Sequence, residues 1–261
     1  MIENSNAMND TLKTIFNLRS IRNFSEREIS KYNLNLIIKA SMRAANASGR
    51  QSYSIIVIDE KNLLEKYFYV ADKGLLFCVD YNRLMDTAKY LNHNYALNNL
   101  RFFVTGATDT ILAAQTAAIA AKSLGIDSLF TNSIHREELD ILFDDFNLPK
   151  KYCFPLIALC LGYASREPNV LKGRLTGLGV VHYNKYQRLN EKELGDIIQE
   201  YDDEKNHLDL PKKDWREAGF NHFLDWFYTV WSRELPAEKL KEFHLTLKNT
   251  GFIDPEWYHE K

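Results

Sequence analysis

The sequence places pairs of cationic side chains at two points where loops are expected. Arg19 and Arg22 belong to the segment "RSIR", and Lys172 and Arg174 flank Gly173 in the segment "LKGRL". Guanidinium and ammonium groups both bind phosphate, the former through two parallel hydrogen bonds. Glycine gives a loop the backbone freedom to bring two cations to one anion. Each pair taken alone is more typical of a solvated helix end or turn, so a phosphate site needs support from the rest of the chain.

Small and polar residues follow two other expected elements. The segment "ASGRQ" comes after a long helical pattern, and "FTNS" comes after a short apolar run that follows Gly125. We expect Arg50 in the first of these segments to point to solvent and Gln51 to have a structural role at the start of a strand. Loops at the ends of buried elements are common places for binding residues.

Several familiar kinds of catalytic site are not indicated. The seven histidines are scattered and form no H-E-x-x-H motif, and no Cys-x-x-Cys is present, so we expect no metal site. The segment "GLGVV" at 177–181 lacks the third glycine and the following helix of a dinucleotide fingerprint. Neither a Walker loop nor a G-x-S-x-G elbow occurs. A Ser/His/Asp triad stays open, although no residue is singled out for it.

Composition limits the class of protein. The 261 residues are 45% hydrophobic, and 33 Lys and Arg against 35 Asp and Glu give a net charge of -2. This balance indicates neither a nucleic-acid surface nor a basic membrane-binding face. The three cysteines show no close pairing, and no stretch has the pattern of a signal peptide or a membrane span. We therefore expect a cytoplasmic protein.

Periodicity predicts an alternation of helices and buried strands. A helix is expected from about Lys31 to Asn46 with Ser30 as its N-cap, and strands are expected over 53–59, 74–80 and 154–163. A further strand follows Gly125. We expect residues 1–10 to be disordered or tag-like, and residues 11–261 to form one domain with a helical C-terminal arm from about residue 187.

A second long helix is expected to open at Thr108 or Asp109 and to stop at Gly125. Its interior is mostly alanine and almost uncharged, which is typical of a central core helix. The alternative is a core helix that also forms a dimer interface, with Ala117 and Ala118 as the first interface candidates.

The order of these segments resembles the FMN-dependent nitroreductase family. The resemblance rests on "RSIRNF", "IIKASMRAANASGRQSYSIIVI", "LLFCVDYNR", "TDTILAAQTAAIAAKSLGI", and "PLIALCLGY" with "LKGRLTGLGVVHYNKY". It covers roughly Thr11 to Tyr186 and is strongest to the subgroup of oxygen-insensitive NADPH nitroreductases and flavin reductases.

The resemblance implies a set of flavin-binding residues but no catalytic acid or base. It implies that Arg19 and Arg22, with Ser20 between them, reach the ribityl phosphate and the ring edge of the flavin. Lys172 and Arg174 complete the phosphate site. Ala47 to Gly49 lie along the flavin, and Asn132 and Ser133 lie behind its ring. These residues are Arg19, Ser20, Arg22, Ala47, Ser48, Gly49, Asn132, Ser133, Lys172 and Arg174.

The resemblance also implies a fold and an activity. The fold is α+β, with a central mixed, mainly antiparallel sheet flanked by helices, in a homodimer with FMN at the subunit interface. NADPH or NADH delivers hydride to flavin N5 and is replaced by a nitroaromatic, quinone or flavin acceptor. NADPH is favoured, with Arg216 and Arg233 as candidates for contacting its 2′-phosphate.

Some residues depart from the subgroup. Gly173 stands where a proline is usual, Ala47 to Gly49 replace a serine run, Asn132 stands where a glycine is usual, and no glutamine precedes "LLFCVD". Two alternatives therefore stay open. One is a divergent flavin enzyme that dehalogenates or cleaves flavin, and the other is a non-catalytic flavin-binding redox sensor or interaction module.

Overall fold

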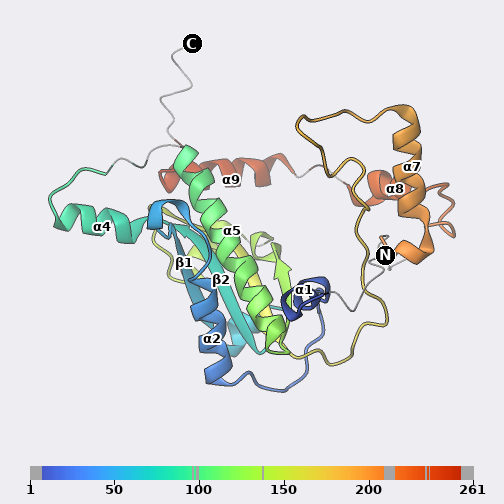
Figure 1. Ribbon diagram of the computed structural model, residues 1–261. Coiled ribbons are helices and arrows are strands. Elements are labelled where there is room, and N and C mark those ends of the chain that lie inside the picture. Colours follow the sequence, from blue (N-terminus) through green and yellow to red (C-terminus); the bar gives the residue numbers. More distant parts are fainter. Residues whose placement is uncertain are drawn as a thin grey trace, which may run out of the picture. The chain divides into compact units, whose positions relative to one another are not determined.

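The computed structural model describes residues 8–95, 97, 100–136, 138–208, 215–232, 234 and 236–253 (Figure 1). Contacts divide the chain into two compact units. The first comprises residues 1–167 and 237–261, and the second comprises residues 168–236. Because α9 (Ala237–Asn249) is in the first unit, the expected C-terminal arm is shared between the two.

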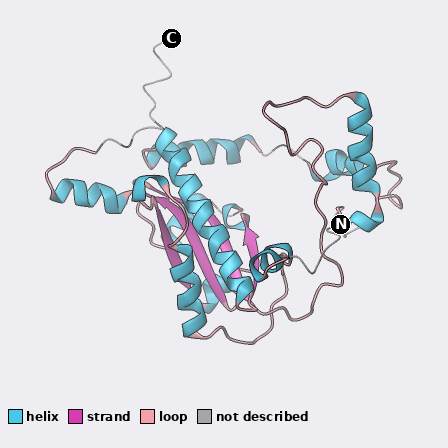
Figure 2. Ribbon diagram, in the orientation of Figure 1, coloured by secondary structure: helices cyan, strands magenta, loops and turns pink. Residues whose placement is uncertain are grey.

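A four-stranded antiparallel sheet forms the centre of the first unit (Figure 2). Its strands lie in the order β1-β2-β4-β3 and comprise β1 (Tyr53–Ile58), β2 (Lys73–Asp80), β3 (Asp127–Thr131) and β4 (Cys153–Gly162). The predicted strands are confirmed, including the strand after Gly125. Parallel pairing is seen at one isolated bridge of the described residues, between Ser20 and Ser128.

Helices cover both faces of this sheet. Successive residues of a strand point to opposite faces, and β2 divides accordingly. Leu75 and Phe77 pack with α2 (Lys31–Ser41) and α5 (Leu100–Ser123), which lie side by side over one face (Figure 1). Leu76 and Cys78 point to the other face of the sheet. There they pack with residues of α3 (Lys61–Tyr67), α6 (Leu139–Asp145) and α9. The sheet is buried between helices, as the apolar strands predict.

The start of α2 is confirmed, and its end is earlier than expected. Ser30 caps the helix by accepting a hydrogen bond from the backbone N–H of Asn33. The helix stops at Ser41, whose hydroxyl donates to the carbonyl of Ala113 in α5 at 2.8 Å. This contact with a distant helix is not visible in local periodicity.

The predicted start of α5 is wrong, because the helix begins at Leu100 and contains both Thr108 and Asp109. The Thr108 hydroxyl donates back to the carbonyl of Val104 at 2.9 Å, as a threonine inside a helix does. Gly106 lies so close to the sheet that an added Cβ would be 2.6 Å from Val79. Tertiary packing therefore explains a glycine that local rules count against a helix.

The alanines of α5 do not form a surface. Ala113, Ala114, Ala117, Ala118 and Ala121 are all at most 2% exposed and pack on the chain's own sheet and α2. The expectation that Ala117 and Ala118 lie at a dimer interface is therefore wrong. The small side chains allow α5 to approach its own sheet closely. The opposite side of α5 carries exposed apolar residues, namely Leu100, Val104, Ile111 and Leu112.

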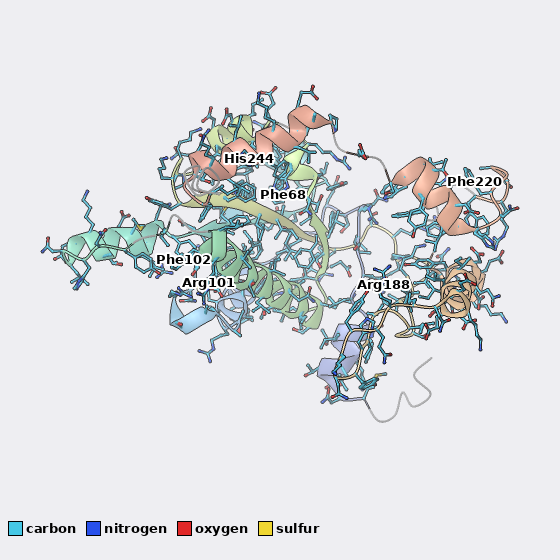
Figure 3. All side chains as sticks on the ribbon, turned by 90° about the horizontal axis from the view of Figure 1, so that it is seen from above. Phe68, Arg101, Phe102, Arg188, Phe220 and His244 are labelled. Atoms are coloured by element: carbon cyan, nitrogen blue, oxygen red, sulfur yellow. The ribbon has the colours of Figure 1, made fainter. Side chains whose placement is uncertain are left out.

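The remaining elements of the first unit are short. They comprise α1 (Asp10–Phe16), α4 (Asn82–Tyr90), and the single 3₁₀ turns η2 (Ala47–Gly49) and η3 (Ser133–His135). Phe102, labelled in Figure 3, lies in the first turn of α5, and its carbonyl accepts a hydrogen bond from the buried Tyr81. None of the described helices is both long and apolar enough to cross a membrane.

The second unit contains α7 (Glu191–Asp202), the 3₁₀ turn η4 (Glu204–Asn206), α8 (Phe223–Trp226) and a π-helical turn (Phe227–Trp231). Asn190 and Glu193 cap α7 reciprocally. The carboxylate of Asp202 accepts from the backbone N–H of Phe223 at 2.8 Å and contacts His222 Nδ1 at 2.7 Å. Asp202 thus joins the end of α7 to the start of α8.

Candidate functional site

The "RSIR" segment lies along the edge strand β3. The backbone N–H of Ile21 donates to the carbonyl of Ser128 at 3.0 Å, and Ser20 and Ser128 form the parallel bridge. Ile21 is only 2% exposed, so it anchors the segment in the core. Ser20 and Arg22, its two neighbours, are exposed. One buried isoleucine thus leaves the flanking side chains available for a ligand.

The guanidinium of Arg19 has a polar partner for some of its N–H groups within the first unit. Its Nη2 forms an ion pair with Glu167 at 2.7 Å, whereas its Nε is buried and has no hydrogen-bond partner among the described residues. A buried unpaired donor is costly and rare in native structures. An anionic ligand beside this guanidinium is the kind of partner that its chemistry suits.

The positive charge of Arg22 acts on the phenol of Tyr69. Hydrogen bonding with Ser133 lowers the pKa of the Tyr69 phenol, whereas burial of the phenol raises it. Hydrogen bonding with Thr131 and the positive charges of Arg136 and Arg22 also lower this pKa. The Thr131 hydroxyl also accepts the Ser133 backbone N–H at 3.0 Å. Arg22, Arg136 and Ser133 thus all act on the same phenol, that of Tyr69.

Tyr69 sits on an unusual piece of backbone. Tyr69 and Val70 have φ of 54° and 56°, in the left-handed region, where a β-branched residue is a true outlier. The preceding Phe68 is fully buried, and a Cβ on Gly74 would be 2.5 Å from its ring. Packing of Phe68 therefore holds the turn that carries Tyr69. Sequence reasoning missed Tyr69, because the segment "YFYV" gives no turn signal.

The loop of Ala47 to Gly49 forms η2, just before β1. Ser48 and Gly49 have φ of 56° and 68°, and Gln51 has φ of 49°. Gln51 is structural as expected, since its amide donates to the carbonyl of Met42 at 3.2 Å. Arg50 does not simply point to solvent, because its Nε donates to the carbonyl of Ala47 at 3.1 Å and thereby braces the loop.

This loop and the cluster around Arg22 belong to opposite edges of the sheet. Ala47 to Gly49 precede β1, whereas Asn132 and Ser133 follow β3, and β2 and β4 lie between these two edge strands. With about 4.8 Å between neighbouring strands, the edge strands are well separated. One chain therefore brings part of the implied site together and leaves the η2 loop apart from it.

Lys172 and Arg174 lie in the second unit. Arg174 Nη1 donates to the carbonyl of Gly173 at 2.7 Å, so the guanidinium folds back on its own loop. An added Cβ on Gly173 would be 1.8 Å from the carbonyl oxygen of Asn206. Gly173 is therefore explained by close backbone approach, where we expected loop flexibility.

His135 connects the end of β3 to the C-terminal helix. Its Nε2 lies 2.8 Å from the carbonyl oxygen of Pro155, and its ring contacts Phe243 of α9 edge-on. Burial lowers the pKa of His135, while the Pro155 carbonyl and the charge of Glu242 oppose this effect. A neutral imidazole in this apolar setting has a packing role.

The residues of the first unit fit a phosphate-bearing cofactor better than a metal. Arg19, Arg22 and Arg136 supply positive charge, and the orphaned Arg19 Nε supplies a donor. Among the described residues, no group of three His, Cys, Asp or Glu side chains could hold a metal ion. Donors of this kind are suited to an anionic group such as a phosphate.

Comparison with known proteins shows which proteins this chain is similar to. A model of the Nitroreductase family matches residues 15–77. The chain is 31% identical over 206 residues to an oxygen-insensitive NADPH nitroreductase of Salmonella typhimurium, covering 76% of this chain and 81% of that protein. It is 30% identical to an FMN reductase [NAD(P)H] of Bacillus subtilis, covering 76% and 82%.

A solved structure extends the likeness to the fold. The NADPH:FMN oxidoreductase from Vibrio harveyi complexed with NAD+ superposes with a TM-score of 0.73 at 25% identity, covering 94% of this chain and 99% of that one. With relatives of this identity and coverage, the chain belongs to the nitroreductase family.

Proposed function

We propose that this protein is an FMN-dependent NAD(P)H oxidoreductase that reduces nitroaromatic, quinone or flavin acceptors. The observation that carries the proposal is the buried Nε of Arg19, which has no hydrogen-bond partner among the described residues, in a segment that Ile21 anchors beside β3 and that leaves Arg22 exposed. The printed names of relatives, an NADPH nitroreductase and an FMN reductase, support it.

The chain's own residues would bind and orient the cofactor. Arg19 and Arg22 would neutralise the phosphate, and in binding it Arg19 would exchange its ion pair with Glu167. The Ser133 backbone region would lie near the ring, where N–H dipoles stabilise negative charge. When bound, FMN supplies the hydride chemistry, so the protein needs no acid or base of its own for that step.

We also propose a homodimer with a shared site, built on one domain per chain. The η2 loop and the Arg22 cluster leave opposite edges of the sheet, so a second copy is the simplest way to place them on one flavin. Exposed apolar side chains of α1 and α5 offer the surface for that contact, namely Leu12, Ile15, Phe16, Val104, Ile111 and Leu112. Lys172 and Arg174 would complete the phosphate site.

The nucleotide preference is proposed as NADPH over NADH, in a cytoplasmic setting. Of the two candidates for the 2′-phosphate, Arg233 lies outside the described residues. Arg216 forms an ion pair with Glu204 at 3.1 Å and stacks on Trp215, with 4.2 Å from its guanidinium carbon to the ring centre. Arg216 would have to exchange these contacts to bind a phosphate. Equal kcat/KM for the two nucleotides would remove this preference and leave the flavin chemistry intact.

The visible spectrum of the purified protein tests the cofactor. We expect a yellow protein whose released flavin runs as FMN and not as FAD. A colourless protein that also fails to bind added FMN would contradict the proposal. Steady-state NADPH oxidation with a quinone then separates an oxidoreductase from a flavin-binding sensor, because a sensor would bind FMN without turnover.

A further inference from the structure

A buried carboxylate in α5 connects to the η2 loop. Asp109 is 2% exposed, and its Oδ1 accepts the backbone N–H of Ala47 at 2.8 Å. Its Oδ2 accepts the backbone N–H of Ser52 at 3.3 Å. A buried carboxylate is tolerated only when its oxygens are satisfied. Here the two donors come from the first and last residues of one short bend.

The bend between those two residues is strained. Ser48, Gly49 and Gln51 all have left-handed backbone, and two of these three are not glycine. Non-glycine residues persist in this region when surrounding structure over-determines them, often at ligand sites. A carboxylate that grips both ends of the bend supplies that constraint.

The side chains of Asn46 and Arg83 hold the same bend from other directions. The Asn46 side-chain oxygen accepts the backbone N–H of Gln51 at 3.2 Å. Arg83 of α4 donates from Nη2 to the carbonyls of Arg50 and Gln51 at 2.8 Å and 2.7 Å. Asp109 differs from both because it is buried and fixes the two ends together.

We infer that Asp109 is a positioning residue for flavin binding, an inference that rests on the proposed function. Asp109 acts through the backbone of Ala47 to Gly49, holding these residues in the shape that lies along the flavin. Because this loop is assigned to the body of the flavin and not to its phosphate, Asp109 supports FMN and riboflavin binding equally. The phosphate-binding Arg22 supports FMN alone.

The test is Asp109→Asn, with titrations of FMN and riboflavin followed by flavin fluorescence and visible circular dichroism. The amide oxygen of asparagine can serve only one of the two backbone N–H groups, and its NH₂ then faces the other donor. We expect affinity for both flavins to fall by the same factor, about tenfold to a hundredfold, as for a lost hydrogen bond to a charged group. Arg22→Ala should weaken FMN binding much more than riboflavin binding.

A matched control is Thr110→Val on the same helix. Thr110 is fully buried, and its hydroxyl donates to the carbonyl of Gly106 within α5 at 2.7 Å. It should lower the melting temperature and leave both flavin affinities unchanged. If Thr110→Val loses as much flavin affinity as Asp109→Asn at the same loss of stability, Asp109 has only a structural role, and the inference is overturned.

Asn46→Ala keeps the inference testable if Asp109→Asn does not fold. Asn46 is half-buried and makes a neutral hydrogen bond to the loop. We therefore expect Asn46→Ala to lower the affinities for FMN and riboflavin by the same factor, which is smaller than that for Asp109→Asn. Unchanged affinities would overturn the inference. Wild-type protein that binds neither flavin overturns the proposed function, and the inference with it. If the wild-type protein binds both flavins and Asp109→Asn binds them with the same affinities, the inference is overturned and the proposed function stands.

Discussion

Arg22 offers a direct test of the phosphate assignment at the scale of one residue. It is exposed and close enough to Tyr69 for its charge to affect the phenol. A charge-assisted hydrogen bond contributes about 1.5–3 kcal/mol, so Arg22→Ala should weaken FMN binding by about tenfold to a hundredfold while the fold survives. Equilibrium titration of the apoprotein with FMN measures this effect.

The control for Arg22 has to avoid the loop residue Arg50. Arg50 braces η2 through the carbonyl of Ala47, so its removal would disturb the loop itself. Arg43 is exposed and follows the end of α2. Arg43→Ala should leave FMN affinity unchanged, and a loss as large as that of Arg22→Ala would contradict the residue assignment.

His135 should make stability depend on pH in a defined direction. Burial lowers the pKa of His135 below its ordinary value of 6.5. The unfolded chain therefore binds a proton more readily, so this contribution to stability is present above about pH 6.5 and is lost as the pH falls below that value. Glu242 of α9 faces the ring and opposes the shift.

Thermal melts of wild type and His135→Gln between pH 5 and 8 measure this effect. The variant should lose less stability than wild type as the pH falls. His244, labelled in Figure 3, is exposed on the same helix α9 and serves as the control. His244→Gln should retain the wild-type pH dependence; identical profiles for wild type and His135→Gln would contradict the prediction.

At the scale of elements, Gly173 lets its loop lie against η4 in the second unit. The Cβ of an alanine would overlap the carbonyl oxygen of Asn206 at 1.8 Å, so the backbone would have to move. Gly173→Ala should cost about 1–3 kcal/mol, as overpacking does. Limited proteolysis should then cleave residues 168–236 faster.

Gly195 provides the matched glycine. It lies inside α7, and an added Cβ would have no neighbour within 4 Å. Gly195→Ala should stabilise the same unit by about 0.5–1 kcal/mol, because alanine favours a helix. Faster cleavage of Gly195→Ala than of Gly173→Ala would contradict the packing argument.

The two sides of α5 should respond differently to a charge. Ala117 is fully buried against the sheet, so Ala117→Glu leaves an unpaired buried carboxylate, at a cost of several kcal/mol, and should unfold the chain. Ile111 is 52% exposed, so Ile111→Glu should give a folded monomer that has lost FMN. Light scattering with absorbance at the flavin band measures both results, and a folded Ile111→Glu monomer with full FMN would contradict the shared site.

At the scale of the whole molecule, a shared site predicts complementation between defective chains. A mixed dimer of Arg22→Ala and Asp109→Asn has one site with both wild-type residues and one site with neither. In a random mixture about one quarter of all sites should then be intact. Co-refolding the two variants and measuring NADPH oxidation tests this; no gain over the separate variants would place each site within one chain.

Local chemistry made part of this protein predictable from its sequence. Ser30 caps α2, and the apolar runs of β1, β2 and β4 are strands, because capping and burial on both faces leave a signal within a few residues. The order of the motifs identified the family.

Other features were decided only by contacts between distant residues. Asp109 resembles a helix N-cap in the sequence, yet it lies inside α5 and bonds to Ser52, 57 residues earlier. The alanines of α5 gave no sign of which side faces the sheet. The left-handed turn at Tyr69 depends on the packing of Phe68 against Gly74. Each of these outcomes is set by the energy of burial between separate elements, which a local pattern does not contain.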